Sequence, residues 1–133
     1  MQAFRLVHEQ IPGAYLTIIG DGPEMDNLKK MASEQNIDQQ VHFTGRILND
    51  EDKARYLLSS SLFVLPGLGG LAINEAFCYN LPVICSTADG TEKQLVLDFI
   101  NGLYCTPNDA MDMAQKIIHI LSHPKLQKKM GEN

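Results

Sequence analysis

The chain has 133 residues, the size of one domain, and its 44% apolar and 20% charged residues exclude wholesale disorder. Eleven Lys and Arg against sixteen Asp and Glu give a net charge of −5, and without a basic run we expect no nucleic acid and no anionic membrane as a partner. No apolar stretch approaches the ~20 residues of a membrane span, and the first residues do not open a signal peptide, so we expect a cytoplasmic protein.

Short apolar runs alternate with helical patterns along most of the chain. The runs predict strands at 15–19, 41–43, 62–65, 82–85 and 103–105. Helical spacing predicts helices at 25–35, 51–59, 71–79, 92–97, 109–121 and 124–130. Asn108 or Asp109 can cap the fifth of these, and Pro124 suits the first turn of the last. Several strands are continuously apolar, which predicts an α/β fold with an open, doubly wound parallel sheet (Rossmann-like) of about five strands.

The first element is predicted to be a helix rather than a strand. Phe4, Val7 and Ile11 share one helical face, and Pro12-Gly13 ends that pattern. A doubly wound domain normally begins with a strand. We therefore expect that the fold lacks its first strand, that residues 1–133 are one domain of a longer chain, and that an apolar patch or sheet edge is left uncovered.

The sequence contexts of the cysteines, of one acidic run and of the histidines indicate structural roles. Cys78, Cys85 and Cys105 lie in apolar contexts and form no C-x-x-C pair, so buried free thiols in a reducing compartment are expected. Asp50–Asp52 has a D-x-D spacing, but it stands where acids cap a helix, so no metal site is predicted. Four scattered histidines are interpreted as solvated or hydrogen-bonded: His8, His42, His119 and His123.

Two glycine-containing loops follow predicted strands, at the edge where such sheets bind ligands. Gly20–Pro23 favours a plain strand-to-helix turn. Pro66–Leu71 holds three glycines before a helix, whose free N–H groups suit a phosphate, and Glu75 follows one turn later, where it could accept ribose hydroxyls. The alternative is that the glycines only allow close packing and that Glu75 serves the helix dipole. The segment alone leaves both open.

Several segments in order resemble one known pattern: Leu16–Pro23, Leu28, Val41–Gly45, Leu62–Pro66, Asn74–Phe77, Leu81–Ile84, Asp89–Glu92 and Asn101–Leu103. Together they resemble the C-terminal, donor-binding half of GT-B glycosyltransferases, specifically the retaining glycosyl transferases group 1 (family 4). The resemblance covers nearly the whole chain. It implies one half of a GT-B fold, which binds a nucleoside diphosphate sugar donor and needs no cofactor.

The resemblance also implies a set of donor-binding residues: Gly22, Gly45, Arg46, Gly69, Gly70, Leu71 and Glu75. Glu75 matches the second Glu of the family's E-x7-E motif, which binds the donor ribose. The N–H groups of residues 69–71 match the segment that holds the diphosphate. Gly45 and Arg46 fall near the loop that holds the base.

The chain departs from the family at two places. Gly67 stands where the first Glu of the E-x7-E motif is expected. The Arg and Lys that stabilise the leaving diphosphate in the family belong to a segment before the first helix. We therefore assign no catalytic residue here and expect the isolated chain to be inactive. The acceptor, a sugar, lipid or polysaccharide, would bind through a missing N-terminal domain.

Two rival functions remain at this point. Gly67 keeps open a non-catalytic nucleotide-binding or scaffold domain of the same fold. A nucleotide-sugar epimerase shares the GT-B architecture, although the motif order fits a transferase better. Sequence upstream of residue 1 would separate them.

Overall fold

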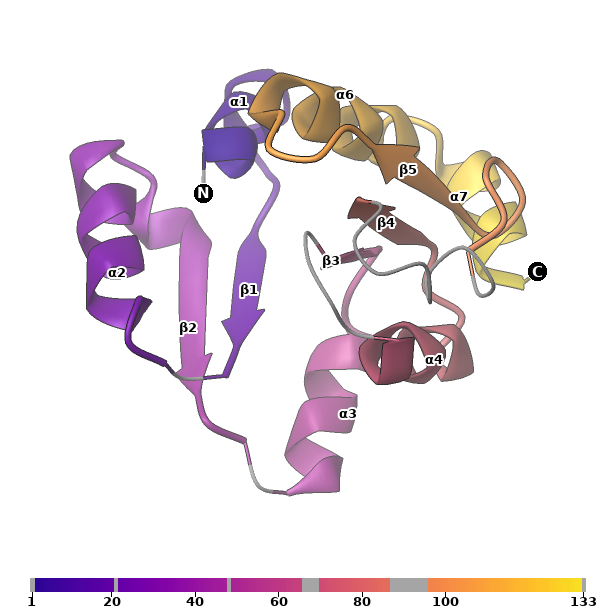
Figure 1. Ribbon diagram of the computed structural model, residues 1–133, viewed down its shortest axis with the longest axis horizontal. Coiled ribbons are helices and arrows are strands. Elements are labelled where there is room, and N and C mark those ends of the chain that lie inside the picture. Colours follow the sequence, from indigo (N-terminus) through magenta and orange to yellow (C-terminus); the bar gives the residue numbers. More distant parts are fainter. Residues whose placement is uncertain (1, 21, 48, 66–69, 87–95, 133) are drawn as a thin grey trace. The chain divides into compact units, whose positions relative to one another are not determined.

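The computed structural model describes residues 2–20, 22–47, 49–65, 70–86 and 96–132, which belong to two compact units, 1–56 and 57–133 (Figure 1). The described residues of the first unit form α1 (Gln2–Gln10), β1 (Leu16–Ile19), α2 (Met25–Glu34), the 3-10 helix η1 (Asp38–Gln40), β2 (Val41–Gly45) and most of α3 (Asp50–Leu58). Among its described residues the second unit contains β3 (Phe63–Leu65), α4 (Gly70–Cys78), β4 (Val83–Ser86), β5 (Gly102–Cys105), α6 (Ala110–Leu121) and α7 (Pro124–Glu132).

The strands of the first unit form a parallel pair. Leu16 of β1 lies opposite Val41 of β2, and the register shifts by one residue between Ile18 and Ile19. The expected N-terminal helix is present as α1, which buries Phe4 and other residues of its apolar face. This part of the chain therefore begins with a helix that leads into a parallel strand, as the sequence predicts.

The second unit is a parallel sheet in the order β3-β4-β5, with helices on both faces (Figure 1). Side chains alternate along each strand, so they enter two separate cores. On the α4 face the core comprises Leu57, Ile73, Ala76, Leu81, Val83, Cys85 and Val96. On the α6 and α7 face it comprises Ile84, Leu103, Cys105, Ile120 and Met130.

β4 and β5 pack too closely to admit a side chain at one position. A Cβ atom at Gly102 would collide with the carbonyl oxygen of Val83 on the neighbouring strand. Gly102 is thus required by strand packing rather than by its own backbone conformation.

The α/β fold with parallel strands is confirmed, and four details differ from expectation. The strands pair as two sheets, β1-β2 and β3-β4-β5, rather than as one five-stranded sheet. Cys78 is exposed because it ends α4 away from the core, whereas Cys85 and Cys105 are buried. Most of the helix expected at 92–97 lies outside the described residues, and Val96 and Leu97 are not helical. His8 is half-buried, and its Nδ1 has no hydrogen-bond partner.

Candidate functional site

The helix that should receive a phosphate begins where β3 has just ended. Gly67 and Gly69 lie outside the described residues, and α4 begins at Gly70, one residue before the predicted start. The first N–H groups of an α-helix have no acceptor within the helix, so α4 itself does not use those of Gly70 and Leu71. α4 also carries no acidic residue in its first turn. Its positive dipole end is therefore not neutralised by a carboxylate of that turn.

Glu75 lies half-buried in α4, four residues after Leu71 and therefore on the same side of the helix. Ile73 and Ala76, which flank it closely in sequence, are buried in the core of the second unit. These two anchors fix the rotation of α4 about its axis. They keep Glu75 at the border between the core and solvent.

The candidates in the first unit follow the carboxyl ends of β1 and β2. Gly20 and Gly45 both have a positive φ, +119° and +71°, and the Gly20 N–H donates to the Gly45 carbonyl oxygen at 3.0 Å. Thr44 Oγ1 donates to the same oxygen at 2.8 Å. Gly45 is thus required by its backbone conformation. Its partner Gly20 was interpreted from the sequence only as part of a strand-to-helix turn, and its bond to Gly45 was not predicted.

Gly22 and Arg46 are both exposed at this edge. The Gly22 carbonyl accepts the Met25 N–H at 3.1 Å, which is the plain turn that the sequence favoured. A Cβ atom at Gly22 would meet nothing within 4 Å, and its φ is not left-handed. The described fold therefore does not itself require glycine at position 22. Gly22, Gly45 and Arg46 belong to one unit, and Gly70, Leu71 and Glu75 belong to the other.

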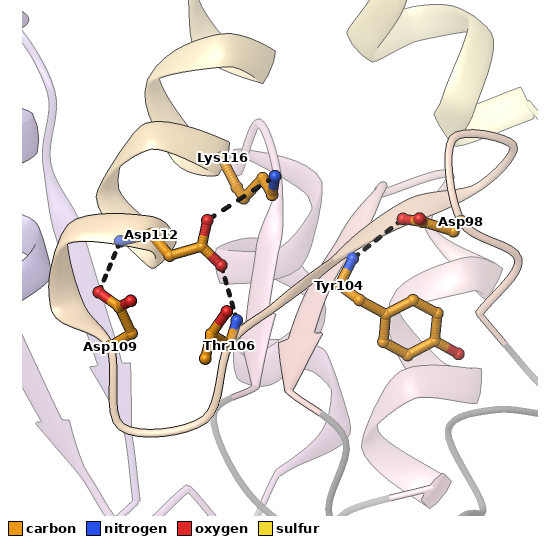
Figure 2. Close-up of polar contacts among 6 residues, drawn as sticks. All are labelled: Asp98, Tyr104, Thr106, Asp109, Asp112 and Lys116. Atoms are coloured by element: carbon orange, nitrogen blue, oxygen red, sulfur yellow. Dashed lines mark hydrogen bonds and ion pairs between the residues drawn. The ribbon is translucent and has the colours of Figure 1, made fainter.

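The connection from β5 to α6 is held by side chains (Figure 2). Asp109 caps α6 and accepts the Asp112 N–H at 3.0 Å. The Asp112 carboxylate accepts the Thr106 N–H at 2.6 Å and lies 3.7 Å from Lys116 Nζ. The hydrogen bond from the Thr106 backbone, more than the nearby Lys116, lowers the pKa of Asp112. The sequence analysis predicted the Asp109 cap. It did not predict the role of Asp112, although the D-x-x-D spacing of the two residues indicated it.

The segment before β5 is fixed in a similar way. The Asp98 carboxylate accepts the Tyr104 N–H at 3.2 Å (Figure 2), and the Tyr104 hydroxyl donates to the Val96 carbonyl at 2.6 Å. The described segments before and after β5 are thus held by hydrogen bonds among polar groups of the second unit.

The acidic start of α3 and three of the histidines take part in contacts within the fold. Asp50 begins α3, and Asn49 Oδ1 accepts the Glu51 N–H at 2.7 Å, as the helix-start interpretation predicts. His42 Nε2 lies 3.2 Å from the Tyr56 hydroxyl, and His123 Nδ1 donates to the His119 carbonyl at 2.7 Å. The part of the chain that the structure describes contains no group of three His, Cys, Asp or Glu able to hold a metal ion. None of its helices is long and apolar enough to cross a membrane.

Comparison with known proteins decides the family. The model of the family described as glycosyl transferases group 1 matches residues 1–133. The chain belongs to this family. The resemblance that the sequence motifs indicate is thereby confirmed.

Relatives and solved structures agree with this family. An uncharacterised glycosyltransferase of Haemophilus influenzae is 29% identical over 136 residues, which cover 99% of this chain and 37% of that protein. The crystal structure of a point mutant of Staphylococcus aureus TarM, in complex with fondaparinux, α-GlcNAc-glycerol and UDP, superposes with a TM-score of 0.90 at 22% identity over 98% of this chain and 26% of TarM. The C-terminal domain of the group 1 glycosyltransferase LpcC from Francisella tularensis gives 0.84 at 23% identity over 99% of this chain and 73% of that domain.

These coverages show which part of a glycosyltransferase is present. The chain spans about a third of the H. influenzae relative and most of the LpcC C-terminal domain. Its fold is that of the C-terminal domain of a GT-B glycosyltransferase.

Proposed function

We propose that the chain is the donor-binding half of a retaining glycosyltransferase, which transfers a sugar, of the hexose type, from a nucleoside diphosphate sugar to an acceptor. The observation that carries the proposal is the start of α4: N–H groups of Gly70 and Leu71 that have no acceptor within the helix, no acid in the first turn, and Glu75 four residues later. A diphosphate is stabilised at such a helix N-terminus, and a carboxylate one turn away can accept two ribose hydroxyls.

The proposal also includes three residues of the first unit: Gly22, Gly45 and Arg46. Gly22 leaves room for a ligand to approach the backbone, because nothing described lies within 4 Å of a Cβ placed there. Arg46 is exposed directly after β2 and would lie near the nucleotide base, with Gly45 fixing the turn before it. The TarM structure with a TM-score of 0.90 contains UDP, which is a nucleoside diphosphate of the expected class.

The proposed enzyme is larger than this chain. We place residues 1–133 as one domain of a longer two-domain protein, whose other domain binds the acceptor and completes the active site. Position 67 carries Gly where the family motif has its first Glu, so contacts to the donor sugar would come from other residues. Cys85 and Cys105, which are buried and form no disulfide, agree with a reducing, cytoplasmic location.

The test is Glu75→Gln in the longer protein, with binding of UDP and GDP measured by calorimetry. The substitution keeps the shape of Glu75 and removes its charge, so nucleotide affinity should fall about tenfold to a hundredfold. Inorganic pyrophosphate, which lacks the ribose, should bind almost unchanged. Glu132→Gln, which removes an exposed carboxylate from α7, is the matched control and should bind nucleotide as wild type does. Wild-type affinity in the Glu75 variant would contradict the assignment.

A second candidate function is a non-catalytic nucleotide-binding domain of the same fold, which Gly67 favours. Both functions predict the Glu75→Gln result, and they differ in turnover. Sugar transfer or donor hydrolysis by the longer protein supports the transferase. Tight nucleotide binding without either activity supports the binding domain.

A further inference from the structure

The turn that precedes β5 carries a strained and exposed aromatic residue. Phe99 has a φ of +64°, a left-handed conformation in which bulky residues are rarely found, and the residue is 66% exposed. Leu97 and Ile100 beside it are 49% and 50% exposed. Burial therefore does not explain why an apolar residue stands where glycine would fit without strain. Strained positions of this kind cluster at sites of function.

The backbone of this turn is held in place by its own hydrogen bonds. The Asn101 Oδ1 accepts the Leu97 N–H at 2.7 Å, and the Leu97 carbonyl accepts the Ile100 N–H at 2.9 Å. The Phe99 N–H donates to the Gly102 carbonyl at 2.9 Å. Leu97, Phe99 and Ile100, called the apolar turn from here on, are thus presented by a fixed backbone. Little further ordering is needed when a partner binds them.

α7 lies beside the apolar turn in both views (Figure 1 and Figure 2). A Cβ atom at Gly131, in the last turn of α7, would collide with the Asn80 carbonyl and would lie 3.7 Å from Pro82 Cδ. The Val83 N–H, one residue further along, donates to the Asn101 carbonyl at 3.3 Å. Both segments therefore pack against the connection that leads into β4. This is the amino end of β4 and β5, opposite to the end where a diphosphate is proposed to bind.

The exposed side of α7 is basic. Lys128 and Lys129 stand three and four residues after Lys125, so the three exposed lysines share the side of the helix away from buried Met130. With Glu132 as its acid, α7 has a net charge of 3 − 1 = +2. None of the three lysines has an ion pair with a described residue. Other basic residues of the described chain are paired with an acid on the same helix: Arg5, Lys30, Arg55 and Lys116.

An apolar turn beside unpaired cations fits the surface of an anionic bilayer. Apolar side chains enter the boundary between headgroups and acyl chains, and lysines near the surface are attracted to anionic headgroups. A protein partner fits less well, because three partly exposed side chains offer less than the ~800 Å² that each side of a stable complex buries. Asp98, the acid of the turn, directs its carboxylate to β5, where it accepts the Tyr104 N–H at 3.2 Å.

We propose that the apolar turn and the lysines of α7 form a docking surface for an anionic lipid bilayer, on which the second unit lies without crossing it. The inference does not depend on nucleotide binding, because its residues lie at the opposite end of the strands. It departs from the expectation that follows from the net charge of −5, since a sum over the whole chain does not describe one face of it.

The test is co-sedimentation of the full-length protein with two kinds of vesicle. One is phosphatidylcholine and phosphatidylglycerol in equal parts, and the other is phosphatidylcholine alone. Wild type should bind the anionic vesicles at least about tenfold more tightly, and high salt should weaken that binding. Equal binding to both kinds of vesicle, or binding to neither, would overturn the proposal.

Phe99→Gly separates docking from folding. It removes the aromatic side chain and relieves the left-handed strain, so Tm should not fall, whereas affinity for the anionic vesicles should fall about tenfold or more. Met111→Ala removes a side chain of similar exposure from the start of α6 and should bind vesicles as wild type does. A lower Tm in Phe99→Gly with unchanged vesicle binding would assign Phe99 a structural role and overturn the proposal.

A pair of double variants tests the charge. Lys128→Gln with Lys129→Gln should weaken binding to the anionic vesicles about tenfold or more, because each lysine near the surface strengthens it several-fold. Lys29→Gln with Lys30→Gln removes the same charge from two adjacent exposed lysines of α2 and is the matched control. Equal losses in both double variants would show that only the net charge matters and would overturn the proposal. So would light scattering that finds a wild-type dimer and a Phe99→Gly monomer, because the surface would then belong to a second copy.

Discussion

Two helices of the second unit, α6 and α4, each follow a strand but differ in the charge at their N-termini. α6 begins with its own carboxylates in place: Asp109 accepts the Asp112 N–H, and Asp112 accepts the Thr106 N–H (Figure 2). α4 begins with Gly70 and has no acid in its first turn. The two helices follow parallel strands of the same sheet, so the difference lies in the sequence of the turns. A helix start that neutralises itself is structural, whereas one without a carboxylate can receive an anionic ligand.

The largest effect is expected from giving α4 the carboxylate that α6 has. Ala72 is the third residue of α4, as Asp112 is the third residue of α6. Ala72→Asp should weaken UDP and GDP binding about tenfold to a hundredfold, because the new charge repels the diphosphate. Ala72→Asn, nearly the same size but neutral, is the control and should bind within about threefold of wild type by the same reasoning. Calorimetry that finds equal affinity for the two variants would show that α4 does not hold the diphosphate.

A moderate effect is expected when the α6 connection loses its carboxylate. Asp112→Ala removes the acceptor of the Thr106 N–H and the ion-pair partner of Lys116. It should lower the free energy of unfolding by about 1–2 kcal/mol, measured by urea denaturation, and leave nucleotide affinity unchanged. A loss of nucleotide binding in a folded Asp112→Ala protein would show that the α6 connection also contributes to the site.

The pH dependence of stability should report the same carboxylate with a smaller effect. The hydrogen bond from Thr106 lowers the pKa of Asp112 below its ordinary value of 3.8. Asp112 therefore stabilises the fold at pH values above that ordinary value, and its contribution is lost as the pH falls through the lowered pKa. Acid denaturation should show a shallower loss of stability in Asp112→Asn than in wild type. Identical acid curves would mean that Asp112 has the same pKa in the unfolded chain.

The fold was largely predictable because its signals are local. Apolar runs gave the parallel strands, and Asp109 and Pro124 marked two helix starts where the structure has them. The pairing into two sheets depends on which strands are neighbours, and no local pattern encodes that. The exposure of Cys78 was missed for a related reason: its apolar neighbours in sequence do not decide which side of α4 it occupies.

The candidate site was predictable in its parts and not in its geometry. The glycines before α4 and the position of Glu75 could be read from spacing, and α4 does begin at Gly70. The positive φ of Gly20 and Gly45, and the hydrogen bond between them, result from two strands far apart in sequence ending at one edge. Such a pairing across the chain exists only after folding, so single-sequence motifs did not reveal it.

The most direct measurement follows the backbone amides of the two helix starts while UDP is added to the longer protein labelled with ¹⁵N. We predict saturable chemical-shift changes at the amides of Gly70 and Leu71, and unchanged shifts at those of Met111 and Asp112 at the start of α6. Binding of UDP that shifts the α6 amides, or that leaves Gly70 and Leu71 unchanged, would contradict the claim that α4 receives the donor diphosphate.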